Sequence, residues 1–164
     1  MALATNKNKP PKSSFLQPTA DQLAALYRCV QSRPGFLVRR AYQRATAVFS
    51  QACESLGITT TQHGVLTILS IVGEIEQSAL ARLLYLDKMT LSGVVRLLEK
   101  KGLIEREASA RDGRGMTLRL SNAGRTLAKD MKAPSHQAQV EFLKPLTKAE
   151  AVQFTALLHK LLGM

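Results

Sequence analysis

The sequence predicts a mainly α-helical protein with one small β-hairpin, and two patterns support this. From about residue 34 onward, apolar residues mostly recur at positions i, i+3, i+4 and i+7, which is typical of amphipathic helices. Between residues 103 and 120 the pattern changes to two short, partly alternating segments separated by a charged, glycine-rich stretch, which is typical of a hairpin. The length of 164 residues corresponds to about one domain.

The charge balance points to a polyanionic partner. The chain has 23 Lys and Arg against 12 Asp and Glu, a net charge of +11, which suits DNA, RNA or a membrane surface. An uncharged apolar run of about 18 residues is absent, which excludes a spanning helix, and the N-terminal residues lack the apolar segment of a signal peptide. Two cysteines are too few for a disulfide framework, so we expect a cytoplasmic protein.

The N-terminal third predicts a tail followed by helices. Residues 1–20 are rich in lysine, proline and serine and are expected to form a flexible basic tail. Within 21–57, a long helix is expected to start after Ser32, with Pro34 in its first turn, and to end at Gly57.

Residues 58–120 predict a compact module of helices and the hairpin. A capping box of Thr59 and Gln62 starts a helix that stops near Gly73. Two short helices follow across a tight turn, one over about 77–84 and one from about 88 to 101. A helix, tight turn, helix and hairpin in this order form a winged helix-turn-helix, whose second helix reads the major groove while the wing reaches the backbone or minor groove.

The second helix of this pair offers groups suited to DNA. Asp87 is its expected N-cap, and the helix ends at Lys101 and Gly102. Its apolar side chains share one face, so the opposite face points outward, with cations for phosphates or guanine and small hydroxyl-bearing residues that permit close approach to bases. The expected contacts on this helix are Lys88, Thr90, Ser92, Gly93 and Arg96.

The tip of the hairpin adds a second set of candidate contacts. Arg111 and Arg114 flank Asp112 in a glycine-rich segment. A guanidinium group at such a tip fits the negative potential of a narrow minor groove, and a neighbouring carboxylate can orient it.

Residues 121–164 predict helices that pair with a second chain. Ser121 caps a helix that Pro134 kinks or interrupts, and a capping box of Thr147 and Glu150 starts the final helix. The apolar stripes on the helices of 21–57 and 121–164 exceed what a winged module of about 70 residues can cover, which predicts a homodimer. Packing of both stripes within one chain is the alternative.

These segments resemble the MarR family of winged helix-turn-helix regulators. The motifs that carry the likeness are Leu80-Ala81, residues 87–104, Arg106, Asp112-Gly113-Arg114 and residues 118–124, and it extends over most of 33–162. It implies a homodimer reading the half-sites of a pseudo-palindrome, with Arg114 in the minor groove, Asp112 orienting it, and Thr90, Ser92 and Arg96 on the bases. Two departures are Tyr85, where the family often has glycine, and Ser121, where it often has threonine.

The resemblance also implies release of DNA by a small aromatic acid bound between the dimerisation helices and the winged module. Arg39, Tyr42 and His63 are candidates to supply a cation, an aromatic wall and a hydrogen-bond donor. Alternatively, Arg39 lies on the surface or contacts DNA, Tyr42 is a core residue and His63 is partly buried. Residues 35–42 are similar to repressors of aromatic or nicotinate-type acid breakdown, so an aromatic or N-heterocyclic carboxylate is the expected effector.

Other function classes have less support. The sequence shows no phosphate-binding loop, nucleophile elbow or framed carboxylate pair, so we expect neither an enzyme nor a cofactor. The three histidines lack zinc-ligand spacing. Two alternatives stay open: a sequence-tolerant architectural DNA-binding protein, and a regulator of the same fold that senses oxidants through Cys29, with Cys53 more suited to the core.

Overall fold

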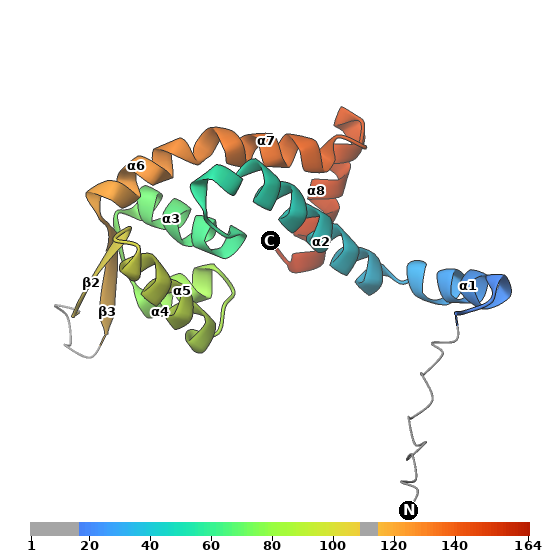
Figure 1. Ribbon diagram of the computed structural model, residues 1–164, viewed down its shortest axis with the longest axis horizontal. Coiled ribbons are helices and arrows are strands. Elements are labelled where there is room, and N and C mark those ends of the chain that lie inside the picture. The colour runs from blue at the N-terminus through green and yellow to red at the C-terminus, as the bar shows by residue number, and fades with distance from the viewer. Residues whose placement is uncertain (1–16, 109–114) are drawn as a thin grey trace, which may run out of the picture. The chain divides into compact units, whose positions relative to one another are not determined.

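The computed structural model describes residues 17–108 and 115–164 (Figure 1). The chain divides into two compact units, one up to Arg40 and one from Ala41 to Met164. Most of the tail expected over 1–20 lies outside the described residues, as do Arg111, Asp112 and Arg114 of the hairpin tip. The described residues are mainly helical with one small antiparallel sheet, which confirms the predicted fold class.

The first unit begins with a helix that starts earlier than expected. α1 (Ala20–Leu26) has a capping box, in which the Thr19 hydroxyl accepts from the Gln22 backbone N–H and the Gln22 side chain accepts from the Thr19 N–H. A π-helical turn (Tyr27–Gln31) follows, and α2 (Pro34–Ala52) then starts with the proline in its first turn. The last residue of the expected tail is thus the first residue of α1, because Thr19 caps this helix.

The second unit contains the end of α2 and the helix that supports the module. α2 ends at Ala52, and a 3-10 turn (Glu54–Leu56) leads to Gly57, whose φ of 58° is left-handed. The long helix expected to run to Gly57 thus ends earlier, at Ala52, and Gly57 instead closes the 3-10 turn that follows. α3 (Thr60–Val72) begins at the predicted capping box and ends at Gly73, with φ 78°.

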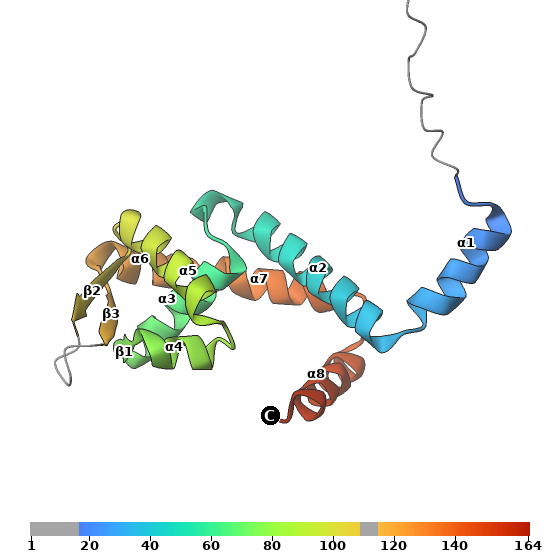
Figure 2. The same cartoon turned by 90° about the horizontal axis from the view of Figure 1, so that it is seen from below.

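The winged module contains the predicted elements and one additional strand. α4 (Gln77–Leu83) and α5 (Lys88–Lys100) are followed by β2 (Ile104–Ala108) and β3 (Met116–Leu120). β1 (Glu74–Glu76) pairs antiparallel with β3 in a sheet of order β1-β3-β2. Figure 2 shows α4 and α5 on one side of this sheet, beside the wing. A strand of three residues is too short for periodicity to reveal.

The core of the second unit lies among α3, α4, α5 and β3. Burial of these apolar side chains is the main stabilising contribution, at about 1.5–3 kcal/mol for each large side chain. The side chains with no solvent exposure are Val65, Leu66, Leu80, Leu91, Val95, Leu98 and Leu118.

Three helices complete the second unit. α6 (Asn122–Asp130) and α7 (Lys132–Leu143) are separated at Met131, and Pro134 lies in the first turn of α7. The predicted interruption is confirmed, because a proline has no N–H for a continuous helix to use but fits a first turn. α8 (Lys148–Leu162) starts at the predicted capping box of Thr147 and Glu150. Hydrogen bonds from the backbone and hydroxyl of Thr147 lower the pKa of Glu150.

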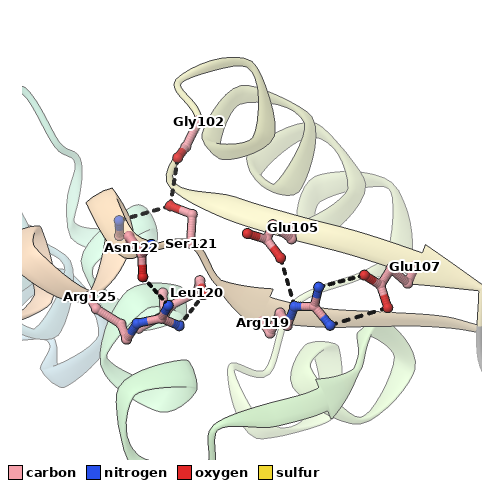
Figure 3. Close-up of polar contacts among 9 residues, drawn as sticks. Gly102, Glu105, Glu107, Arg119, Leu120, Ser121, Asn122 and Arg125 are labelled. Atoms are coloured by element: carbon pink, nitrogen blue, oxygen red, sulfur yellow. Dashed lines mark hydrogen bonds and ion pairs between the residues drawn. The ribbon is translucent and has the colours of Figure 1, made fainter.

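Ser121 joins the turn after α5 to the start of α6 (Figure 3). Its hydroxyl donates to the Gly102 carbonyl at 2.6 Å and accepts from the Gly124 N–H at 3.0 Å, so it caps α6 as threonine would. Its own N–H donates to the Leu103 carbonyl at 3.1 Å. A Cβ on Gly124 would lie 1.9 Å from that same carbonyl oxygen, so only glycine fits there.

The turn between α4 and α5 contains the one non-glycine residue of the described chain with a positive φ. Tyr85 has φ 51°, and its side chain is 83% exposed. A left-handed conformation costs a non-glycine residue about 1–2 kcal/mol. Glycine adopts a positive φ without this cost, which explains why glycine is common at this position in the family that the sequence resembles. This chain adopts the same conformation with Tyr85.

We predict that Gly124→Ala lowers the free energy of unfolding by about 1–3 kcal/mol, because the new methyl group must displace the Leu103 backbone. The matched control is Gly93→Ala in the middle of α5, where an added Cβ meets no atom within 4 Å. That change should raise stability by about 0.5–1 kcal/mol through helix propensity. Urea unfolding measures both, and equal stabilities of the two variants would contradict the close contact.

Candidate nucleic-acid interface and effector pocket

The outward face of α5 carries the predicted DNA contacts. Lys88, Thr90, Gly93 and Arg96 are exposed, and Ser92 is half-buried. The buried face holds Leu91, Val95 and Leu98, as the helical period requires. The structure therefore places the two cations of this set in solvent, while Ser92 lies at the edge of the core.

The hydroxyl groups of α5 are already hydrogen-bonded within the chain. Thr90 donates its hydroxyl proton to Asp87 Oδ2 at 2.6 Å, and its backbone N–H donates to Asp87 Oδ1 at 2.8 Å. The hydrogen bond from the Thr90 side chain is the main reason for the lowered pKa of Asp87, ahead of that from its backbone. Ser92 Oγ instead accepts from Gln77 Nε2 at 2.9 Å, across the helix pair.

A cavity of about 500 Å³ lies beside α5, between α4 and the wing strands. The polar side chains of its lining belong to Glu76, Gln77, Ser78, Lys88, Ser92 and Arg106. Arg106 and Gln77 were not predicted as site residues. Strand alternation could have indicated Arg106, because it shares a face of β2 with the buried Ile104.

The opposite face of the wing strands carries an ion-pair cluster, shown in Figure 3. Arg119 on β3 binds Glu105 at 2.7 Å and Glu107 at 2.6 Å, both on β2. The hydrogen bond with Glu105 and the charges of both carboxylates raise the pKa of Arg119 further. This guanidinium group is therefore occupied by β2, whereas Arg106 points to the cavity beside the recognition helix.

A second cavity of about 250 Å³ lies among α2, α3 and α7. Tyr42 and His63, two predicted effector residues, both line it, together with Thr46 and Phe49. Tyr42 is 66% exposed, so its alternative assignment as a core residue was wrong. Thr46 Oγ1 is buried, and none of the described residues forms a hydrogen bond with it.

The third predicted effector residue, Arg39, belongs to the first unit. Its guanidinium carbon lies 5.8 Å from the centre of the Phe36 ring, a cation–π contact one turn away on the same helix. Its role in effector binding stays a prediction.

His63 meets the cavity as an uncharged group near neutral pH. Its ring contacts Phe49 edge-on, with 5.0 Å between the ring centres, and the side chain is half-buried. Burial lowers the pKa of His63 below its ordinary value of 6.5, because desolvation disfavours the charged form. The imidazole can therefore donate one hydrogen bond and accept another.

The two cysteines occupy different environments. Cys53 is buried in the core, and burial raises the pKa of its thiol, while Cys29 is exposed. Among the described residues, no group of three His, Cys, Asp or Glu side chains could hold a metal ion. No helix in the same part of the chain is long and apolar enough to cross a membrane.

A tight helix pair with a basic outer face, followed directly by an antiparallel wing, is the architecture of winged helix-turn-helix regulators, which bind duplex DNA. Comparison with known proteins gives the family. The model of the MarR family matches residues 56–115. The HTH-type transcriptional repressor Rv2887 of Mycobacterium tuberculosis is 31% identical over 77% of this chain and 91% of its own. The repressor NicR of Pseudomonas putida is 29% identical over 81% of this chain and 84% of its own.

Solved structures agree with this assignment. A "probable transcriptional regulator from Pseudomonas aeruginosa" has a TM-score of 0.76 at 36% identity and covers 80% of this chain and 98% of its own. Bordetella bronchiseptica BpsR, whose structure addresses regulation of DNA binding by 6-hydroxynicotinic acid, has a TM-score of 0.73 at 30% identity over 77% of this chain and 96% of its own. Staphylococcus aureus MepR in complex with DNA has a TM-score of 0.73 at 26% identity and covers 80% of this chain and 97% of its own.

This chain belongs to the MarR family, as its motifs had indicated, and is a DNA-binding transcriptional regulator. Regulators of this family are transcription factors and not enzymes, and none of these comparisons indicates a catalytic family.

We predict that His63 makes stability depend on pH. The pKa of His63 is lowered in the folded chain, so the unfolded chain binds the proton more readily. Its contribution to stability is therefore complete above the unfolded pKa of about 6.5. It is lost progressively as pH falls below that value. Urea unfolding between pH 7.5 and 5.5 should show a shallower pH dependence for His63→Gln than for the wild type, and identical slopes would contradict this.

Proposed function

We propose that the chain is a homodimeric repressor that binds a pseudo-palindromic operator and is released by a small aromatic or N-heterocyclic carboxylate. The observation that carries this proposal is the cavity among α2, α3 and α7, since α3 also packs against the winged module. A ligand in this cavity touches the helix on which the DNA-reading elements rest. The family's relatives and structures support the same class of regulator.

The unpaired apolar surface of α8 supports the homodimer. None of its residues is buried in the single chain, although it carries an apolar stripe. Exposed apolar surface of this extent is unusual in a soluble monomer and indicates an interface. The side chains that are more than half exposed are Val152, Leu157, Leu161 and Leu162.

The recognition helix and wing support operator reading. Lys88 and Arg96 are exposed on α5, and Arg106 lines the adjacent cavity. Outside the described residues, Arg114 is proposed to enter the minor groove with Asp112 orienting it, and Arg111 is proposed as a further DNA contact. Two modules held side by side would then contact successive half-sites, about one helical turn apart.

The chemistry of the second cavity supports a single-ring acid as the effector. Its volume of about 250 Å³ is just below the usual range of ligand pockets, and Tyr42, Phe49 and Phe142 supply aromatic walls. No lysine or arginine of the second unit's described residues lines it, so a bound carboxylate there depends on neutral donors such as Thr46 and His63. The BpsR structure concerns control of DNA binding by 6-hydroxynicotinic acid, an N-heterocyclic carboxylate, which makes this compound a suitable first probe.

Footprinting on the DNA flanking the protein's own gene tests the proposal. We expect protection of one pseudo-palindrome, a preference over random duplex of about 10³ or more, and loss of protection when 6-hydroxynicotinic acid or a related aromatic acid is added. Sedimentation should give a dimer. Equal affinity for all sequences would instead support an architectural protein, and a monomer would contradict paired half-site reading.

We predict that Thr46→Val weakens binding of the effector by roughly 3–10-fold, the value of one hydrogen bond. The same change should raise the free energy of unfolding by up to about 1 kcal/mol, because it removes a buried hydroxyl that none of the described residues satisfies. Thr46→Ser, which keeps the hydroxyl, is the matched control and should bind like the wild type. Calorimetry with 6-hydroxynicotinic acid measures affinity, and unaltered binding by Thr46→Val would exclude this hydroxyl from the site.

A further inference from the structure

The two hydroxyl groups of the recognition helix are held in opposite hydrogen-bonding states. The Thr90 proton is used on Asp87, so Thr90 offers oxygen lone pairs and a methyl group to an approaching partner. The Ser92 oxygen accepts from Gln77, so the proton of Ser92 is not used in that bond. Two residues that look equivalent in sequence therefore differ in what they can recognise.

Gln77 holds Ser92 from another helix. It is the first residue of α4, and its Nε2 reaches Ser92 Oγ on α5 at 2.9 Å. Its other amide end, Oε1, is buried and accepts no hydrogen bond from any described residue. A buried amide that uses only one end costs free energy, so its retention calls for an explanation.

Ser92 lines the cavity beside the recognition helix. The hydroxyl donates to none of the described residues, and Ser92 lines the cavity of about 500 Å³ together with Lys88, Arg106 and Glu76. Two cations against one carboxylate give this lining a net positive charge, which attracts hydrogen-bond acceptors with negative charge or partial charge. Nucleic acid offers such acceptors as phosphate oxygens and as guanine, thymine or adenine atoms in the major groove.

We propose that Gln77 is a positioning residue that fixes Ser92 as a hydrogen-bond donor toward DNA, so that this point of the recognition helix selects acceptors. The proposal rests on the DNA-binding function and adds a specificity-determining residue that does not itself need to touch DNA. The Thr90 hydroxyl already donates its proton to Asp87, so Thr90 can only accept hydrogen bonds from base donors or contact a thymine methyl group.

Gln77→Glu tests the proposal because a carboxylate only accepts. The Ser92 proton then turns inward to residue 77, and Ser92 presents its lone pairs outward. If the acceptor is a base, selection from a random duplex library should shift at one half-site position toward cytosine or adenine, with a change in preference of roughly 3–10-fold. If the acceptor is a phosphate, the preferred sequence stays the same and affinity falls on every duplex.

The new charge of Gln77→Glu also repels DNA, so the variant is made in a Ser92→Ala background as well. Repulsion acts equally in both backgrounds, whereas the effect through the hydroxyl disappears when Ser92 is absent. We expect the two changes to be non-additive by about threefold or more in affinity, on operator or on random duplex. Gln77→Met, which adds no charge, should reduce the same discrimination without reversing it.

Additive effects of the two substitutions together with an unchanged selection profile would overturn the role of Gln77. If the wild-type chain selects no sequence, the proposed operator is contradicted instead. Affinities of the single and double variants for random duplex would then still test the coupling between Gln77 and Ser92. Thermal unfolding of each variant verifies that it is folded. If Gln77→Met does not fold, Gln77→Glu in the two backgrounds is sufficient to test the proposal.

Discussion

The arrangement of the DNA-reading elements depends on the close approach of α6 to the backbone of Leu103. Leu103 ends the turn after the recognition helix and leads into the wing, and its carbonyl oxygen occupies the space where a side chain of residue 124 would be. Ser121 binds both sides of this contact. Lys101 adds a hydrogen bond to the Gly57 carbonyl at 2.7 Å, which ties the same turn to the segment ahead of α3. These contacts join the end of α5, the start of the wing and the supporting helices at one point.

The fold could be predicted wherever a local rule decides it. The helices that begin at Thr59, Asp87, Ser121 and Thr147 were predicted correctly, because an N-cap depends on residues three positions apart. The capping box at Thr19 follows the same rule but lies within a segment whose composition indicated a tail. β1 was missed for a different reason, since its existence depends on pairing with β3, more than forty residues away in sequence.

The candidate site shows the same division between local and long-range information. Helical periodicity correctly placed Lys88, Thr90, Gly93 and Arg96 on the exposed face of α5. It could not show that Gln77 occupies the hydroxyl of Ser92, or that Thr46 has a buried hydroxyl in a cavity, because both depend on contacts between different helices. Tyr42 and His63 were correctly brought to one cavity by the expectation of a ligand near the junction of their helices, whereas the neutral character of His63 depends on burial that only the fold provides.

The proline in the first turn of α7 has a mechanical consequence. A continuous helix would bond the N–H of residue 134 to the carbonyl of Asp130, and proline lacks that N–H. Bending at this point therefore breaks no hydrogen bond from residue 134. The bend lies between α6, which contacts β3 of the wing, and α7, which lines the cavity among α2, α3 and α7. A change in the angle between α6 and α7 would therefore leave the backbone hydrogen bonds within each helix intact.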